Sequence, residues 1–243
     1  MSELSNYIDE YLKTEYTLKS TLKDSVQSSV YLYQKNNSAK QIVKISQKNR
    51  NDHVLRRLRG QLNKNTATIY EVCSNDEDVT VLEEYISGAT LRHIVEANGG
   101  TLKRELAVKY ALDICNGLVF IHSLGIIHRD IKPSNIIITE QGEAVIIDFG
   151  IARLTDDSKY ADTKNLGTAG YAAPEQFGIY QSGPVTDIYA VGVLLNELLL
   201  GVHPTIDTPK GKLGKVINKC IMAQMSKRYQ NVSELAEVLN KLL

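Results

Sequence analysis

The stretch from residue 128 to residue 150 constrains what this chain can fold into more than any other segment. It reads His-Arg-Asp-Ile-Lys-Pro-Ser-Asn at 128–135 and Asp-Phe-Gly at 148–150. Asp130 can accept a proton, and Lys132 carries a positive charge. Asn135 and Asp148 offer oxygen atoms of the kind that hard cations such as Mg²⁺ prefer. Moving a phosphoryl group from a metal-bound nucleotide requires this set of groups, so the motif predicts phosphoryl-transfer chemistry.

This pair of motifs resembles the catalytic loop and metal-binding motif of eukaryotic-type (Hanks-type) serine/threonine protein kinases, and the chain looks most like the small soluble bacterial members. The resemblance covers the chain from about Tyr16 to its C-terminus. It implies an α+β fold and a single two-lobed domain over residues 1–243. The N-terminal lobe, 1–84, would be an antiparallel sheet with one main helix, and the C-terminal lobe, 85–243, would be mostly helical.

The resemblance also assigns roles to the residues of the catalytic loop. Asp130 would orient the acceptor hydroxyl and take its proton, with Lys132 beside it. Asn135 and Asp148 would hold Mg²⁺, with Mn²⁺ as an alternative. Thr168, in the segment 167–175 that would receive the substrate backbone, is expected to bond to Asp130 and Lys132. The cofactors implied are therefore ATP and a divalent cation, and the acceptor is a protein with a Ser or Thr hydroxyl.

The nucleotide would contact residues of both lobes. Lys44 is the counterpart of the strand lysine that grips the α- and β-phosphates, and Ile42 stands where the family has a small alanine. Glu83 takes the position behind the adenine, ahead of the hinge. The set expected to line the nucleotide is Leu22, Val30, Ile42, Lys44, Glu83, Glu84, Tyr85, Ile137 and Asp148.

The N-terminal third departs from the family pattern. Lys23, Ser25 and Ser28 stand where the phosphate-covering loop should have three glycines. Active kinases pair the strand lysine with a helix Glu, but the only acidic residue between Lys44 and Ile69 is Asp52. Asp52 is a candidate substitute with a shorter side chain. These departures keep a second hypothesis open, a pseudokinase or nucleotide-binding signalling module with weak or no catalysis.

Three further contacts are predicted for the C-terminal lobe. His128 is expected to be a structural residue under Phe149 rather than a catalyst. Glu175 should form a buried ion pair with Arg228, and Asp187 should hold the catalytic loop through its backbone.

A regulatory phosphate is expected on the loop between residues 150 and 173. A phosphate on this loop would find a cationic partner in Arg129. The candidates are Thr155, Ser158, Thr163 and Thr168, and Thr163 is the predicted site. An unmodified polar loop is the alternative reading.

Composition argues against nucleic-acid binding, cysteine-based metal or disulfide sites, and membrane insertion. Lys plus Arg and Asp plus Glu are balanced at 28 each, so no global field favours nucleic acid or anionic lipid. Three well-separated cysteines fit neither a metal site nor a disulfide framework. No apolar run is long enough for a membrane span. We therefore expect a cytoplasmic protein without nucleic-acid partners or membrane insertion, with a second copy of the chain left open as an autophosphorylation partner.

Hydrophobic periodicity predicts where helices and strands lie. The expected helices are 4–14, 52–59, 106–121, 191–200, 216–222 and 232–243, and the expected strands are 16–18, 30–33, 41–45, 68–72 and 79–83. Residues 204–216 should form a loop where the family has an additional helix.

Three functions are compatible with these observations. An active protein kinase is favoured, because every residue expected near the transferred phosphoryl group is retained. The pseudokinase is the second reading. A kinase for small molecules is the third, and the family-like segment 167–175 argues against it.

Overall fold

The structure is a computed structural model that describes residues 3–26, 28–48, 51–75, 77–156, 167–177 and 181–243. The chain divides into two compact units. The first unit comprises residues 1–63 and 67–86, and the second comprises 64–66 and 87–243. The sequence places the lobe boundary after residue 84, whereas the observed division follows residue 86 and assigns 64–66 to the second unit.

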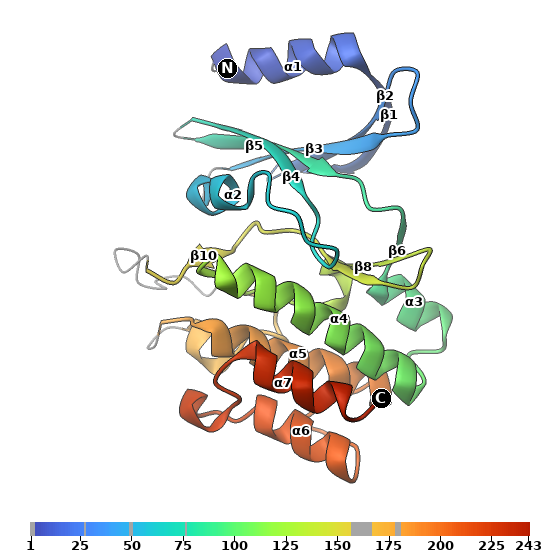
Figure 1. Ribbon diagram of the computed structural model, residues 1–243, viewed down its shortest axis with the longest axis vertical. Coiled ribbons are helices and arrows are strands. Elements are labelled where there is room, and N and C mark those ends of the chain that lie inside the picture. The colour runs from blue at the N-terminus through green and yellow to red at the C-terminus, as the bar shows by residue number, and fades with distance from the viewer. Residues whose placement is uncertain (1–2, 27, 49–50, 76, 157–166, 178–180) are drawn as a thin grey trace. The chain divides into compact units, whose positions relative to one another are not determined.

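The first unit is built on a five-stranded antiparallel sheet (Figure 1). Its strands are β1 (Tyr16–Asp24), β2 (Ser28–Lys35), β3 (Gln41–Lys48), β4 (Ile69–Ser74) and β5 (Asp78–Glu84), in the spatial order β1-β2-β3-β5-β4. β3 and β5 are rich in β-branched residues at neighbouring positions, which suits a pleated surface covered on both faces. All five strands lie at or near the predicted positions.

Two helices accompany this sheet. α1 (Glu3–Glu15) places Ile8 and Leu12 one turn apart, and both pack in an apolar cluster with Ile42 and Leu82. α1 passes directly into β1 without a linker. α2 (Asp52–Leu58) is a short helix between β3 and β4 that buries three apolar side chains.

The second unit is mostly helical. Its helices are α3 (Leu91–Ala97), α4 (Arg104–Ser123), α5 (Pro184–Leu200), α6 (Lys212–Cys220) and α7 (Val232–Asn240). Its strands are β6 (Gly88–Thr90), β7 (Ile126–Ile127), β8 (Ile136–Thr139), β9 (Ala144–Ile146) and β10 (Arg153–Leu154). They pair as a three-stranded sheet, β6-β8-β9, and a two-stranded one, β10-β7.

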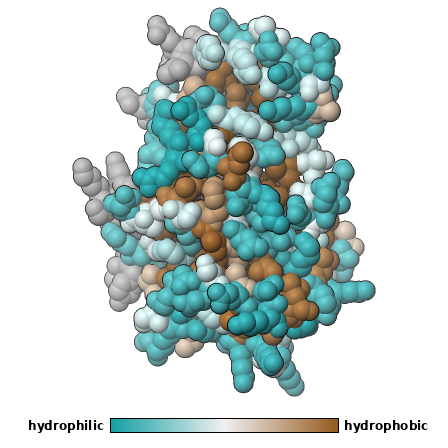
Figure 2. Space-filling view, viewed as in Figure 1, coloured by the Kyte–Doolittle hydropathy of each residue, from teal (hydrophilic) through white to brown (hydrophobic). Residues whose placement is uncertain are grey.

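The core of this unit lies among α4, α5 and α7, which contact one another and lie together in the lower half of Figure 1. α4 buries an apolar series at helical spacing that includes Ala107, Ile114, Leu118 and Ile121. Figure 2 shows that hydrophilic residues cover most of the visible face, with apolar side chains in small groups. No helix among the described residues has the length and apolar character needed to cross a bilayer.

Each of the six predicted helices is present, but α3, a further helix among the described residues, was not predicted. The largest boundary differences are at the starts of α5 and α6. α5 begins at Pro184 rather than at residue 191, because Thr186 caps its first turn by accepting a 3.0 Å hydrogen bond from the Gly183 amide. α6 begins at Lys212, so the predicted loop after Pro204 is shorter than expected.

Candidate active site

The β8–β9 hairpin places the expected metal ligands at one end of two paired strands. Asn135 directly precedes β8, and Asp148 follows the end of β9 by two residues. The strands are antiparallel with Ile136 opposite Ile146, and the Ile147 amide donates a 3.0 Å hydrogen bond to the Asn135 carbonyl. Because the end of one antiparallel strand lies beside the start of the other, the two residues are brought to the same edge.

Asp187 holds the backbone of the catalytic loop, as predicted. Its fully buried carboxylate accepts hydrogen bonds from the amides of His128, at 3.0 Å, and Arg129, at 2.8 Å. It also lies 2.8 Å from His122 Nε2. Burial alone would raise the pKa of Asp187, but the hydrogen bond and charge of His122, together with the amide bonds, outweigh it and lower the pKa. The loop is therefore tied to α5 through one ionised side chain.

Asp130 lies at the centre of a dense polar cluster. Lys132 Nζ lies 2.6 Å from one carboxylate oxygen, and the Thr168 hydroxyl donates to the other at 2.7 Å. Lys132 and Thr168 are themselves 2.7 Å apart, and Asn135 Nδ2 donates to Asp130 at 2.9 Å. The predicted contact of Thr168 with both charged residues is thus confirmed.

This environment controls the charge of Asp130. Burial would raise the pKa of its carboxyl, but hydrogen bonds from Lys132 and Thr168 and the positive charge of Lys132 lower it overall. Asp130 is therefore an ionised carboxylate near neutral pH, with its oxygens directed into the cluster by three different donors. The arrangement can orient a hydroxyl group and accept a proton from it.

Asn135 and Asp148 have the chemistry that a magnesium site needs. The amide nitrogen of Asn135 is engaged by Asp130, which leaves its side-chain oxygen for a cation. Asp148 is exposed, adopts a left-handed backbone with φ of 65°, and accepts a 3.0 Å hydrogen bond from the Gly150 amide. Mg²⁺ is commonly held by one or two such oxygens together with water and phosphate. The residues present therefore fit this cation.

Two structural contacts surround the cluster. His128 is completely buried and meets the Phe149 ring edge-on, with centroids 5.2 Å apart, so its predicted packing against Phe149 is confirmed. The predicted ion pair of Glu175 and Arg228 is also confirmed, with N–O distances of 2.7 and 2.8 Å and side chains at most 1% exposed. Thr186 donates a further 2.9 Å hydrogen bond to Glu175.

The nucleotide-lining residues of the first unit do not share one face of the sheet. Directly opposed residues in antiparallel strands point to the same side, and neighbours along a strand point to opposite sides. Leu32, Val43 and Glu83 are paired across β2, β3 and β5 and share one face of the sheet. Tyr31, Lys44 and Leu82 are paired in the same way and share the other face. Lys44 is therefore on the opposite face from Glu83.

The same alternation separates the other members of the expected set. Val30 lies opposite Ile45 and so shares the Glu83 face, whereas Ile42 and Glu84 share the Lys44 face. The single pocket that the sequence predicts from Val30, Ile42, Lys44 and Glu83 is not formed in this structure. The physical reason is the pairing register of the β2–β3 hairpin. Val30 is paired with Ile45, the residue after Lys44, so the side chains of Val30 and Lys44 point to opposite faces of the sheet.

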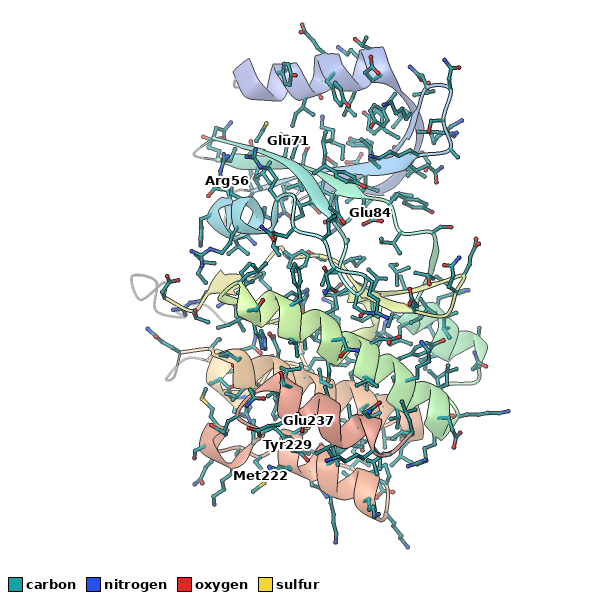
Figure 3. The ribbon with its side chains drawn as sticks, in the orientation of Figure 1. Arg56, Glu71, Glu84, Met222, Tyr229 and Glu237 are labelled. Carbon is teal, nitrogen blue, oxygen red and sulfur yellow. The ribbon has the colours of Figure 1, made fainter. Side chains whose placement is uncertain are left out.

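The remaining expected contacts of the first unit are local. Leu22, in β1, is half exposed. Glu84, labelled in Figure 3, donates its amide to the Thr68 carbonyl at 2.9 Å and accepts from the Thr68 amide at 3.2 Å. Tyr85 follows β5 in the first unit, and Ile137 lies in β8 of the second. A polar cavity of about 490 Å³ in the first unit is lined by Lys44 together with Ser25 and Ser28, two of the residues that replace the expected glycines.

Lys44 has a partner that sequence reasoning missed. Its Nζ lies 2.5 Å from Asp9 Oδ1 on α1. Asp52, the candidate substitute for the helix Glu, instead bonds to Arg56 at 3.3 Å and to the Ser74 hydroxyl at 2.8 Å; Arg56 is labelled in Figure 3. The signal that could have pointed to Asp9 is its place beside Ile8 on the apolar side of an amphipathic helix.

The predicted phosphorylation site, Thr163, lies outside the described residues. Its expected partner Arg129 is buried, with a left-handed backbone at φ of 67°, and its Nε donates to the Ile151 carbonyl at 2.8 Å.

Comparison with known proteins decides the family. A model described as the protein kinase domain matches residues 14–243, which is most of the chain. The chain belongs to the protein kinase family. The match begins at the end of α1, so nearly all of this helix lies ahead of the part shared with the family.

Several bacterial kinases are similar to this chain. A probable serine/threonine-protein kinase of Clostridium acetobutylicum is 33% identical over 74% of this chain, and one of Clostridium perfringens is 31% identical over 79%. The serine/threonine-protein kinase PknB of Mycolicibacterium smegmatis is 40% identical over 53%. The matches cover 31%, 32% and 21% of those proteins, so the chain spans about a third of the length of the first two.

Proposed function

We propose that this kinase domain transfers the γ-phosphoryl group of ATP to Ser or Thr hydroxyls of proteins. The observation that carries the proposal is the polar cluster of Asp130, Lys132, Asn135 and Thr168, in which every member bonds to Asp130. The names of the related proteins, which describe serine/threonine kinases, support the same class of acceptor.

Each residue of the cluster would have its own role in the reaction. Asp130 would accept a hydrogen bond from the acceptor hydroxyl and take its proton as the new oxygen–phosphorus bond forms, while the bond from the γ-phosphorus to the bridging oxygen breaks and ADP leaves. Lys132 lies beside the same carboxylate, where its charge would stabilise the transferred group. Asn135 and Asp148 would hold Mg²⁺, which when bound neutralises charge on the nucleotide phosphates. Positioning and charge stabilisation supply most of the catalysis in this reaction class.

The pseudokinase alternative rests on the first unit alone. Lys44 and Ile42 face away from Val30 and Glu83, and the hairpin lacks its glycines. None of these features touches the Asp130 cluster, which a catalytically inactive domain has no need to keep bonded in this way. We therefore favour an active enzyme whose nucleotide site is altered.

The test is transfer of labelled phosphate from MgATP to the protein itself and to a generic Ser/Thr protein substrate. The wild-type protein should become labelled on Ser or Thr, and Asp130→Asn should abolish labelling while leaving the melting temperature nearly unchanged. Asp156→Asn, in an exposed carboxylate outside the cluster, is the matched control. A folded wild-type protein that transfers no phosphate to any acceptor would favour the binding-module reading.

The site of self-labelling and the compartment belong to the same proposal. We expect modification at Thr163 and a cytoplasmic location; three buried cysteines that form no disulfide support the latter. Mapping the labelled peptide by mass spectrometry, and repeating the assay at several protein concentrations, tests whether a second copy of the chain is the acceptor.

A further inference from the structure

We propose that Asp9 weakens nucleotide binding: it holds Lys44 in an ion pair under α1 and competes with the nucleotide phosphates for that lysine. The inference rests on the nucleotide-binding part of the proposed function and not on phosphoryl transfer, because it takes Lys44 as the residue that binds the phosphates. Asp9 Oδ1 and Lys44 Nζ are 2.5 Å apart, with the side chains 32% and 14% exposed. The pair is thus shielded more than most surface ion pairs.

The charges around Lys44 favour an exclusive pairing. Asp9 comes from α1, on the same face of the sheet as Lys44, while Asp52 is engaged by Arg56 and Ser74. A phosphate that approaches the ammonium group would bring its negative charge next to the Asp9 carboxylate. Like charges at such separation repel, so phosphate and Asp9 bind Lys44 in competition.

An apolar contact supports the ion pair. Ile42 lies two positions before Lys44 on β3 and therefore points to the same face. Ile8 and Leu12 of α1 pack on it, and Ile42 is only 2% exposed. A nucleotide that used both Ile42 and Lys44 would have to displace this part of α1.

α1 is anchored at a point remote from Asp9. Asn36 donates its amide to the Glu15 carbonyl at 2.9 Å and its side-chain nitrogen to the Thr14 carbonyl at 3.1 Å. These bonds hold the C-terminal end of the helix to the β2–β3 turn and do not involve Asp9. The Asp9–Lys44 ion pair can consequently open while the C-terminal end of α1 stays bonded to the β2–β3 turn.

The experiment compares Asp9→Asn with Glu10→Gln, its exposed neighbour on the same helix. Two quantities are measured in each full-length protein: the acylation rate of Lys44 by a lysine-reactive ester, read by mass spectrometry, and the Kd for MgATP from equilibrium titration. We expect Asp9→Asn to raise the acylation rate and to lower the Kd about fivefold, the scale of a partly shielded ion pair. Glu10→Gln should match the wild type in both.

Two further variants make the test specific. Leu12→Ala, which weakens the apolar contact without adding charge, should also lower the Kd. Lys44→Met should remove the difference between Asp9→Asn and wild type. An unchanged or raised Kd in folded Asp9→Asn would overturn the inference, because Asp9 would then be neutral or would assist the nucleotide. Absence of phosphoryl transfer in every protein, with the Kd difference retained, would overturn the proposed function and leave this inference standing.

Discussion

At the scale of single residues, the carboxylate of Asp130 is held in place by three hydrogen-bond donors of the candidate site. It receives hydrogen bonds from Lys132, Thr168 and Asn135, and those from Lys132 and Thr168, with the charge of Lys132, lower its pKa in spite of burial. When a neighbouring cation or hydrogen-bond donor is removed, the pKa of such a carboxylate rises.

Replacing Lys132 should therefore change both rate and pH dependence. In Lys132→Met the pKa of Asp130 rises, so the acid limb of the kcat/KM profile moves to higher pH, and the maximal rate falls about 100-fold for loss of one charged donor. The pH–rate profile of phosphoryl transfer measures both effects. Lys241→Met, in an exposed residue, is the control; an unmoved acid limb in Lys132→Met would contradict the role assigned to the cluster.

Asp187 provides a pH-dependent contribution to stability. Its pKa is lowered in the folded state, so its contribution is fully present above the ordinary aspartate pKa of about 3.9 and is lost as the pH falls through the folded value. Asp187→Asn should cost about 1–3 kcal/mol of unfolding free energy at neutral pH. Urea denaturation of both proteins is measured between pH 5 and pH 3, about one unit on each side of the ordinary pKa. The difference in unfolding free energy between wild type and Asp187→Asn should become smaller as the pH falls. A constant difference would be evidence against an ionised Asp187.

Residue-level prediction from sequence works where the contacts are short in sequence or belong to one motif. Asp130, Lys132 and Asn135 lie within six residues of one another, and the structure shows them bonded. The Asp9–Lys44 pair spans 35 positions and depends on which face of β3 α1 covers, which no local pattern reveals.

At the scale of elements, the buried ion pair links the short helical turn at 174–177 to the turn before α7. Arg228 bonds to both oxygens of Glu175 and also to the Met222 carbonyl at 2.8 Å. Such a pair mainly specifies how elements join, and either partner left alone is an uncompensated buried charge.

Breaking one partner should be much worse than removing both. Arg228→Leu is expected to destabilise the protein by about 3–5 kcal/mol, and the double variant Glu175→Leu with Arg228→Leu should recover a large part of that loss. Chemical denaturation of the two single variants and the double variant gives the coupling free energy. Additive losses would show that the two side chains contribute independently.

Strand pairing explains why the nucleotide-lining set was only partly predictable. The positions of β2, β3 and β5 follow from their runs of β-branched and aromatic residues, but the face that each residue occupies depends on the exact register. With Tyr31 opposite Lys44, the lysine joins Ile42 on the α1 face, and a shift of one residue would reverse this. Hydrophobic pattern alone does not decide between these registers when both faces are covered.

At the scale of the whole molecule, ligand binding should appear as stability. A nucleotide that binds only the folded state at a free concentration 100 times its Kd adds about 2.7 kcal/mol to the unfolding free energy. For a chain of this size each kcal/mol corresponds to roughly 2–4 °C in melting temperature. MgATP should thus raise the melting temperature by several degrees, and chelation of the metal should remove most of the shift.

Asp148→Ala is the matched variant for this measurement, because it removes an expected metal ligand from an exposed position. It should keep the melting temperature of the free protein and lose the response to MgATP. No response of the wild type at millimolar nucleotide would count against both nucleotide-dependent readings of the fold.

The position of α1 has a practical consequence for anyone who excises the catalytic unit. A recombinant fragment trimmed to the family match would start at residue 14 and would discard Ile8, Asp9 and Leu12. Ile42 and Lys44 would then lose the helix that covers them, and kinetics recorded on that fragment would describe a nucleotide site without its α1 contacts.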